Sequence, residues 1–119
     1  MKIIADIDLP FFDMMFEGRA EVVRLKGTSI TSGAVKDADA LIVRSVTKVG
    51  EQLLADSRAT FVGTATIGVD HVDTAWLASR GIGFASAPGC NANAVSEYLV
   101  AALLELSARF GFRLKGASI

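Results

Sequence analysis

Short, almost purely apolar runs recur along the chain, and each is followed by a turn or a helix-start signal. The clearest, residues 40–43, reads Ala-Leu-Ile-Val between polar neighbours. Such a run is typical of a central strand in a parallel sheet, because both of its faces are covered. Similar runs begin at Lys2, Ala20, Thr60 and Gly83. The repeated order of strand and helix predicts an α/β fold with a doubly wound parallel sheet.

Helix signals lie between these runs. Pro10 suits a helix start, because its missing N–H would be unpaired there in any case, and Gly18 ends that helix. Asp73 is expected to be the N-cap of a later helix that stops at Gly81. Two further short helices are expected over residues 32–37 and 50–56.

The segment from Ala92 to Arg109 predicts one long helix with apolar side chains on nearly every face. Its charged stripe is thin, and Glu105 and Arg109 are spaced i, i+4 as a weak surface pair. A helix that is apolar all round is buried on more than one side. We therefore expect it to contact another domain or subunit, with a place at the centre of this domain as the alternative. Its charges argue against a membrane span.

Composition limits the class of partner. The chain has 119 residues, enough for one domain, and 51% of them are apolar. Its 12 basic and 13 acidic side chains give a net charge of −1, which disfavours nucleic acid and anionic membranes as partners. The single cysteine, Cys90, cannot form an internal disulfide, which fits a reducing compartment. No targeting segment is visible, and we expect a cytoplasmic protein.

Two polar loops follow predicted strands, where doubly wound sheets bind their ligands. The loop from Arg44 to Lys48 offers two hydroxyls and two cations, which suit a phosphate or carboxylate. Alternatively, Ser45 or Thr47 caps the next helix and both cations are solvated. The second loop, residues 63–70, combines two glycines with two threonines, but it also reads as a plain turn in which Asp70 and Asp73 are caps.

Neither loop matches a nucleotide fingerprint of the G-x-G-x-x-G or Walker type. His71 is the only histidine, and no second metal ligand or nucleophile is paired with it at an interpretable spacing. Cys90 lies between a Pro-Gly turn and a helix, but it has no candidate base nearby in sequence. No catalytic, cofactor-binding or metal-binding residue is therefore expected within the chain.

Three blocks resemble the D-2-hydroxyacid dehydrogenase family: residues 41–49, 61–73 and 87–98. The family pattern Gly-x-Asp-x-Val-Asp is present at 68–73, and Asn-Ala-x-x-Val-x-Glu-Tyr is present at 91–98. Arg-Ser-Val-Thr-Lys at 44–48 and Ala-Pro-Gly-Cys-Asn at 87–91 narrow the resemblance to the erythronate-4-phosphate branch. The resemblance covers essentially the whole chain.

The resemblance implies a function. Members of this branch oxidise 4-phosphoerythronate, a phosphorylated hydroxy acid, to the 2-oxo acid with NAD, early in pyridoxal phosphate (pyridoxine) biosynthesis. They have a flavodoxin-like substrate domain, a Rossmann cofactor domain and a dimerisation region, so a homodimer is expected. By residue-by-residue transfer, Ser45 and Thr66 match positions that contact the substrate. Arg44 is a further candidate, because its charge would suit the phosphate.

The same resemblance implies a division of the chain. Residues 1–90 are expected to be the substrate-side portion, 91–112 an interdomain or dimer-contact helix, and 113–119 the start of the dinucleotide-binding domain. The family's catalytic arginine, glutamate and histidine fall after Ile119, so His71 is not the catalytic histidine. We therefore expect the 119-residue chain to be inactive alone.

Two other readings are open. A receiver-type signalling domain has about this length, and Asp6 and Asp8 superficially match its acidic pocket. However, Arg44 stands where a receiver needs an aspartate, and residues 85–87 lack its lysine. A non-catalytic binding module is the second reading, and a reading frame that continues into a glycine-rich strand-turn-helix would exclude it.

Overall fold

The computed structural model of the chain describes residues 1–111 and 113. The chain divides into two compact units, Met1–Pro88 and Gly89–Ile119. The predicted start of a further domain at 113–119 lies outside the described residues except for Arg113.

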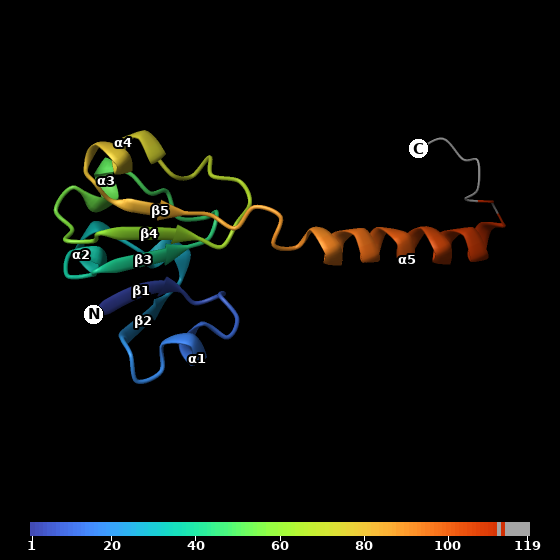
Figure 1. The fold of residues 1–119 in the computed structure, drawn as a ribbon, viewed down its shortest axis with the longest axis horizontal. Coiled ribbons are helices and arrows are strands. Elements are labelled where there is room, and N and C mark those ends of the chain that lie inside the picture. The colour runs from blue at the N-terminus through green and yellow to red at the C-terminus, as the bar shows by residue number, and fades with distance from the viewer. Residues whose placement is uncertain (112, 114–119) are drawn as a thin grey trace. The chain divides into compact units, whose positions relative to one another are not determined.

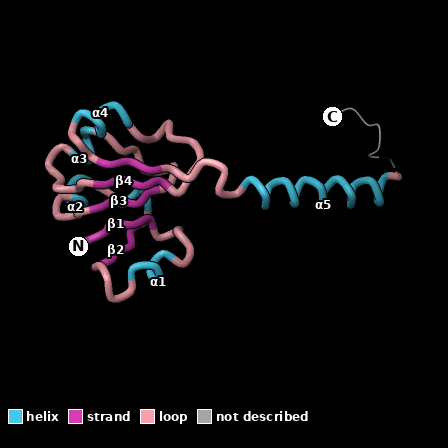
Figure 2. Tube along the Cα trace, in the orientation of Figure 1, coloured by secondary structure: helices cyan, strands magenta, loops and turns pink. Residues whose placement is uncertain are grey.

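The first unit is built on one sheet of five parallel strands (Figures 1 and 2). The strand order β2-β1-β3-β4-β5 is that of the flavodoxin-like doubly wound fold. All the predicted strands are confirmed to within about one residue, and the apolar run at 40–43 is the central strand. The strands are β1 (Lys2–Asp6), β2 (Glu21–Leu25), β3 (Ala40–Val43), β4 (Phe61–Thr64) and β5 (Gly83–Ala85).

Short helices cover the two faces of this sheet unequally. On one face, α2, α3 and α4 contribute buried Val35, Leu54 and Leu77 to a cluster with alternate strand residues. On the other face, α1 contributes Phe12 to a smaller cluster. The helices of this unit are α1 (Phe12–Phe16), α2 (Ser32–Val35), α3 (Glu51–Leu54) and α4 (Thr74–Ser79), with a 3₁₀ turn at Gly27–Ser29.

The strand register explains why the larger cluster is continuous. Ile4 pairs with Leu41, Leu41 with Val62 and Val62 with Phe84, so one layer of apolar side chains crosses the sheet. Ile4, Leu41 and Val62 are all buried. Side chains alternate between the faces of a strand, so their neighbours in sequence face the opposite side. This buried layer fixes the register, and with it the edge at which the strands end.

Helix α1 begins two residues later than the sequence predicts, at Phe12 instead of Pro10. The reason is Phe11, which adopts a left-handed backbone conformation at φ 57° and cannot belong to the helix. Phe12 is buried, and the Arg24 guanidinium lies 5.5 Å from the centre of its ring. Gly18, at φ +69°, ends the segment as predicted.

The second unit contains the long helix α5 (Ala92–Phe110), which ends at Gly111 in the left-handed conformation. The predicted pair is present, with Arg109 Nε 2.6 Å from Glu105 Oε1. None of the side chains from Ala92 to Phe110 is buried, and among the described residues the two core clusters end at Phe84. The structure therefore does not show the burial predicted for this helix. Within residues 1–111 and 113, no helix is long and apolar enough to cross a membrane.

Candidate substrate-binding site

The two predicted binding loops leave neighbouring strands at the same edge of the sheet. Val43 and Thr64 are the last paired residues of β3 and β4, and the Ala65 N–H donates to the Val43 carbonyl at 3.0 Å. Because the strands are parallel, Ser45 and Thr66 each come two residues after this last pair, in loops at the same edge of the sheet. The carboxyl ends of the strands, marked by the arrowheads in Figure 1, are where ligands bind in this kind of fold.

Backbone hydrogen bonds join these loops beyond the sheet. Val49 forms an isolated parallel bridge with Val72: its N–H donates to the His71 carbonyl at 2.8 Å, and its carbonyl accepts from the Asp73 N–H at 2.8 Å. The loop after β5 is joined as well, since the Ala87 N–H donates to the Thr66 carbonyl at 3.3 Å. We call residues 44–50, 65–73 and 86–88 the carboxyl-edge loops. Their main chains hold one another in place.

Arg44 and Ser45 are both exposed at the start of the first of these loops. The Arg44 guanidinium pairs with the Asp8 carboxylate, from the loop after β1, at 3.3 Å. Both side chains are substantially exposed, at 45% and 69%, and a pair of this kind contributes at most about 1 kcal/mol. An incoming phosphate or carboxylate can therefore compete with Asp8 for Arg44.

Thr47 has a structural role. It is 3% exposed, and its hydroxyl donates to the Gly27 carbonyl at 3.0 Å. The N-cap of α3 is Gly50, which makes no side-chain cap bond. The alternative in which Ser45 or Thr47 caps this helix is therefore wrong. The hydrogen bond from Thr47 to Gly27 instead joins the loop that carries Arg44 and Ser45 to the turn after β2.

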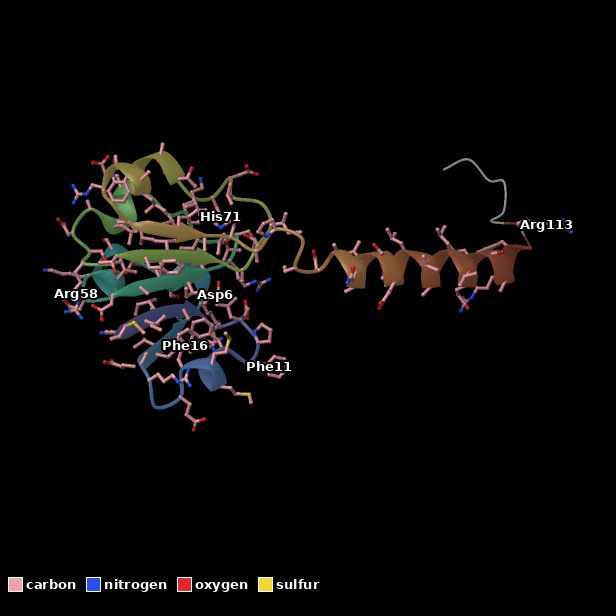
Figure 3. All side chains as sticks on the ribbon, viewed as in Figure 1. Asp6, Phe11, Phe16, Arg58, His71 and Arg113 are labelled. Atoms are coloured by element: carbon pink, nitrogen blue, oxygen red, sulfur yellow. The ribbon has the colours of Figure 1, made fainter. Side chains whose placement is uncertain are left out.

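Thr66 belongs to a hydrogen-bonded network that the sequence did not reveal. Its Oγ1 donates to the Gly68 carbonyl at 2.9 Å and lies 2.7 Å from Thr64 Oγ1. Thr64 is 4% exposed, and its Oγ1 lies 2.9 Å from Nε2 of His71, which is labelled in Figure 3. The only sequence signal was the Thr-x-Thr spacing, because His71 comes close only when the loop folds back.

The remaining predictions for these loops have mixed outcomes. Asp73 caps α4 as predicted, since its Oδ1 accepts from the Trp76 N–H at 2.9 Å. Asp70 is exposed and is not the N-cap. Cys90 is exposed in the segment before α5. Within the described part of the chain, no three His, Cys, Asp or Glu side chains gather to hold a metal ion.

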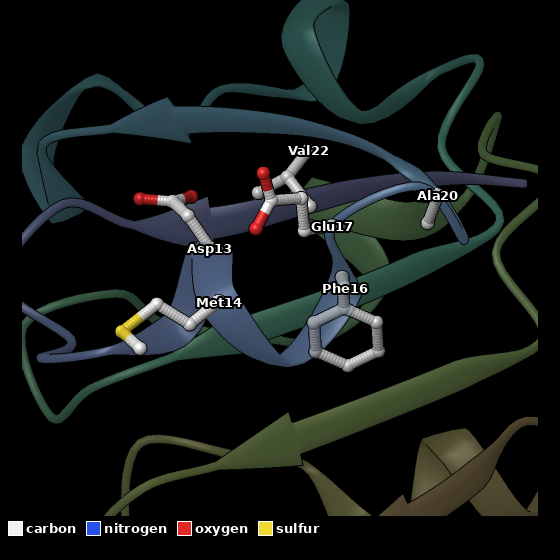
Figure 4. Close-up of a pocket in the computed structure, with 6 residues that line it drawn as sticks. All are labelled: Asp13, Met14, Phe16, Glu17, Ala20 and Val22. Carbon is white, nitrogen blue, oxygen red and sulfur yellow. The ribbon is translucent and has the colours of Figure 1, made fainter.

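Two hollows in the first unit differ in their relation to this site. One, of about 390 Å³, lies between α1 and β2 and includes the carboxylates of Asp13 and Glu17 (Figure 4). Its two carboxylates disfavour an anionic ligand, and neither this hollow nor the next is lined by Arg44, Ser45 or Thr66. The other, of about 400 Å³, includes Thr64, Ala65 and Ala87 and therefore borders the carboxyl-edge loops. Its size suits a small metabolite.

Residues 4–109 match the sequence profile of the D-isomer specific 2-hydroxyacid dehydrogenase catalytic domain. The chain belongs to this family. It is 52% identical over 119 residues to the erythronate-4-phosphate dehydrogenase of Edwardsiella ictaluri, and all of the chain aligns. The alignment covers 32% of that relative, so the chain spans about a third of its length.

Solved structures show the same fold. The TT0316 protein from Thermus thermophilus superposes with a TM-score of 0.76 at 24% identity, over 92% of this chain and 38% of that one. A D-lactate dehydrogenase from Aquifex aeolicus, solved with NAD and lactic acid, gives a TM-score of 0.69 at 22% identity, over 91% and 34%. The family fold thus matches the predicted doubly wound sheet.

Proposed function

We propose that this chain is the substrate-binding portion of an NAD-dependent dehydrogenase that oxidises 4-phosphoerythronate to the 2-oxo acid on the route to pyridoxal phosphate. The observation that carries the proposal is the placement of Arg44, Ser45 and Thr66 along one sheet edge. The chain that carries them is 52% identical to a relative named erythronate-4-phosphate dehydrogenase. Membership of the 2-hydroxyacid dehydrogenase family supports a hydroxy acid as the substrate class.

Each residue has a distinct proposed role. Ser45 and Thr66 donate hydroxyl hydrogen bonds to substrate oxygens, and Arg44 binds the phosphate after exchanging its partner Asp8 for the ligand. A guanidinium suits this task because it is permanently charged and presents several N–H donors in one plane. Together they would hold the hydroxyl-bearing carbon in a fixed orientation, which is the contribution of a substrate domain to hydride transfer.

The described residues do not fit a dinucleotide site. Of the two glycines at 63 and 68, Gly63 lies within β4 itself, where an added Cβ would be 2.9 Å from Ile42 Cδ1. Neither residues 63–70 nor residues 44–48 have the G-x-G-x-x-G spacing of a dinucleotide fingerprint. We therefore propose that NAD is bound by a part of the full-length protein other than these residues.

We also propose that α5 lies between domains and contributes to a homodimer in the full-length protein. Large apolar side chains are exposed on several sides of this helix, including Tyr98 at 73%, Leu104 at 56% and Phe110 at 74%. An apolar surface of this kind is unfavourable in water and marks an interaction site. The single cysteine supports a further proposal that the protein works in the reducing cytoplasm.

The dimer proposal predicts that the 119-residue chain self-associates in sedimentation velocity as its concentration rises. Leu104→Lys should shift the profile toward monomer, whereas Arg109→Lys, which keeps the charge on another face of the helix, should have a smaller effect. A strictly monomeric wild-type profile at high concentration would count against this role for α5.

The substrate proposal is tested by titrating the ¹⁵N-labelled 119-residue chain with 4-phosphoerythronate and following amide chemical shifts. Binding should shift amides in residues 44–48 and 63–70 and leave the opposite edge of the sheet unchanged. Ser45→Ala and Thr66→Val should each weaken binding by about threefold to tenfold, which corresponds to one hydrogen bond. Thr60→Val is the matched control, because Thr60 precedes β4 at the far edge. Saturable shifts that are unaffected by Ser45→Ala and Thr66→Val would refute these assignments.

A further inference from the structure

Hydrogen counting fixes the direction of the bonds around Thr66. A carbonyl oxygen can only accept, so the Thr66 hydroxyl donates its single hydrogen to Gly68 at 2.9 Å. With that hydrogen used, Thr66 Oγ1 must accept in its 2.7 Å contact with Thr64 Oγ1. The hydroxyl of Thr64 is therefore the donor in this pair.

Hydrogen counting also fixes the direction of the bond between Thr64 and the imidazole of His71. The single hydrogen of Thr64 is used on Thr66, because its other acceptor, the Val43 carbonyl, lies at 3.5 Å and cannot compete with a contact of 2.7 Å. Thr64 Oγ1 must then accept from His71 Nε2 at 2.9 Å, so this nitrogen carries a hydrogen. The resulting chain of donors runs from His71 through Thr64 and Thr66 to the Gly68 carbonyl.

We propose that His71 and Thr64 are positioning residues that keep the Thr66 hydroxyl oriented as a hydrogen-bond donor to the substrate. This inference rests on the proposed function, in which Thr66 contacts 4-phosphoerythronate. In the free chain the Thr66 hydrogen points to Gly68, and on binding it turns to a substrate oxygen while the bond from Thr64 persists. A hydroxyl already accepting from Thr64 favours ligand atoms that accept, such as carboxylate or phosphate oxygens.

The arrangement has few competing states. Thr64 is 4% exposed, so water has little access to redirect its hydroxyl. Nε2 carries a hydrogen both in the imidazolium and in the neutral Nε2–H tautomer, and both give the same direction. Only the neutral Nδ1–H tautomer of His71 would reverse the direction of these hydrogen bonds. Thr66 would then donate to Thr64, and the Gly68 carbonyl would lose its donor.

The first test needs no ligand. The tautomer of His71 is measured from long-range ¹H–¹⁵N correlations of the imidazole in the ¹⁵N-labelled 119-residue chain, at a pH where the ring is neutral. We expect the Nε2–H tautomer in the wild type and loss of this preference in Thr64→Val. A dominant Nδ1–H tautomer in the wild type would overturn the proposal, whether or not the chain binds substrate.

The second test measures affinity for 4-phosphoerythronate by amide shifts in four variants. Thr64→Val and His71→Leu remove the chain of donors and should weaken binding by about threefold to tenfold. Thr64→Ser and His71→Gln keep a hydroxyl or an N–H donor and should restore most of the affinity. Urea unfolding of each variant reports any loss of stability separately.

Failure of this inference and failure of the proposed function give different patterns. If Thr66→Val binds substrate as well as the wild type, Thr66 is not a contact and the proposed function loses that residue. If Thr66→Val weakens binding but the folded Thr64→Val and His71→Leu variants do not, only the positioning role is overturned.

Discussion

Gly27 allows an unusually close approach between the turn after β2 and the loop that carries the proposed binding residues. A Cβ added at this position would overlap Val46 Cγ2 and lie 2.8 Å from Asp6 Oδ2 and 3.1 Å from Thr47 Oγ1. Gly27 does not have a positive φ, so the reason for glycine here is space and not backbone conformation. Gly27→Ala should therefore push the two segments apart.

The cost depends on which neighbours can move. Val46 is 63% exposed and can rotate away, but the Asp6 side chain is fully buried and Thr47 is tied to the Gly27 carbonyl itself. Inserting a methyl group into a packed site costs about 1–3 kcal/mol. Restricting the unfolded chain by Gly→Ala offsets about 0.4–1 kcal/mol of this. A net loss of about 1–2 kcal/mol in the free energy of unfolding is expected.

Urea unfolding of the 119-residue chain measures this loss. With a slope of about 1–3 kcal/mol per molar urea, the midpoint should fall by roughly 0.3–2 M. Gly33→Ala is the matched control, because Gly33 lies in α2 and an added Cβ would have no neighbour within 4 Å. That change should be neutral or stabilising by about 0.5–1 kcal/mol. If Gly27→Ala and Gly33→Ala shift the midpoint alike, the close approach has no energetic consequence and the reasoning is refuted.

Two further predictions concern the first unit. Asp73→Ala removes the hydrogen bond from the Trp76 N–H and should cost about 1 kcal/mol of stability, which is a fall of roughly 4 °C in Tm. Asp73→Asn should retain most of the cap, so equal losses in the two variants would contradict this role. The pKa of Asp39 lies below its ordinary value of 3.8. The main cause is the hydrogen bond from the Lys2 N–H to its carboxylate at 2.6 Å, and the positive charge of Arg58 adds to the effect. This carboxylate therefore adds stability above about pH 4 that is lost as pH falls through its lowered pKa. Asp39→Asn should weaken the acid dependence of the urea midpoint in that window, and an unchanged acid dependence would exclude this contribution.

The strands could be predicted because each is a short apolar run, and because these runs alternate with helix signals as a parallel sheet requires. Residues 40–43 are all apolar, and the structure covers both faces of that strand. The order of elements also predicts that β3 and β4 end at the same edge of the sheet, so the loops that carry Ser45 and Thr66 could be expected there. The cap at Asp73 depends only on residues three apart, and it too was visible in the sequence.

Other features depend on contacts between residues distant in sequence or on one unusual backbone angle. The hydrogen bond from Thr47 to Gly27 joins residues 20 positions apart, and nothing in the sequence around either residue predicts the other as its partner. The pairing of His71 with Thr64 requires the loop after β4 to fold back on its own strand. The late start of α1 at Phe12 depends on Phe11 at φ 57°, although Pro10, two residues before that start, suits the first position of a helix.

The bridge between Val49 and Val72 has a consequence for redesign of this family. An insertion before Val49 either bulges within the segment from Arg44 or slides Val49 along its partner, which displaces the His71 carbonyl. Changes of length in the loop after β3 are thus transmitted to the loop after β4. When binding loops are exchanged between relatives, segments 44–50 and 65–73 should therefore be replaced together as one unit.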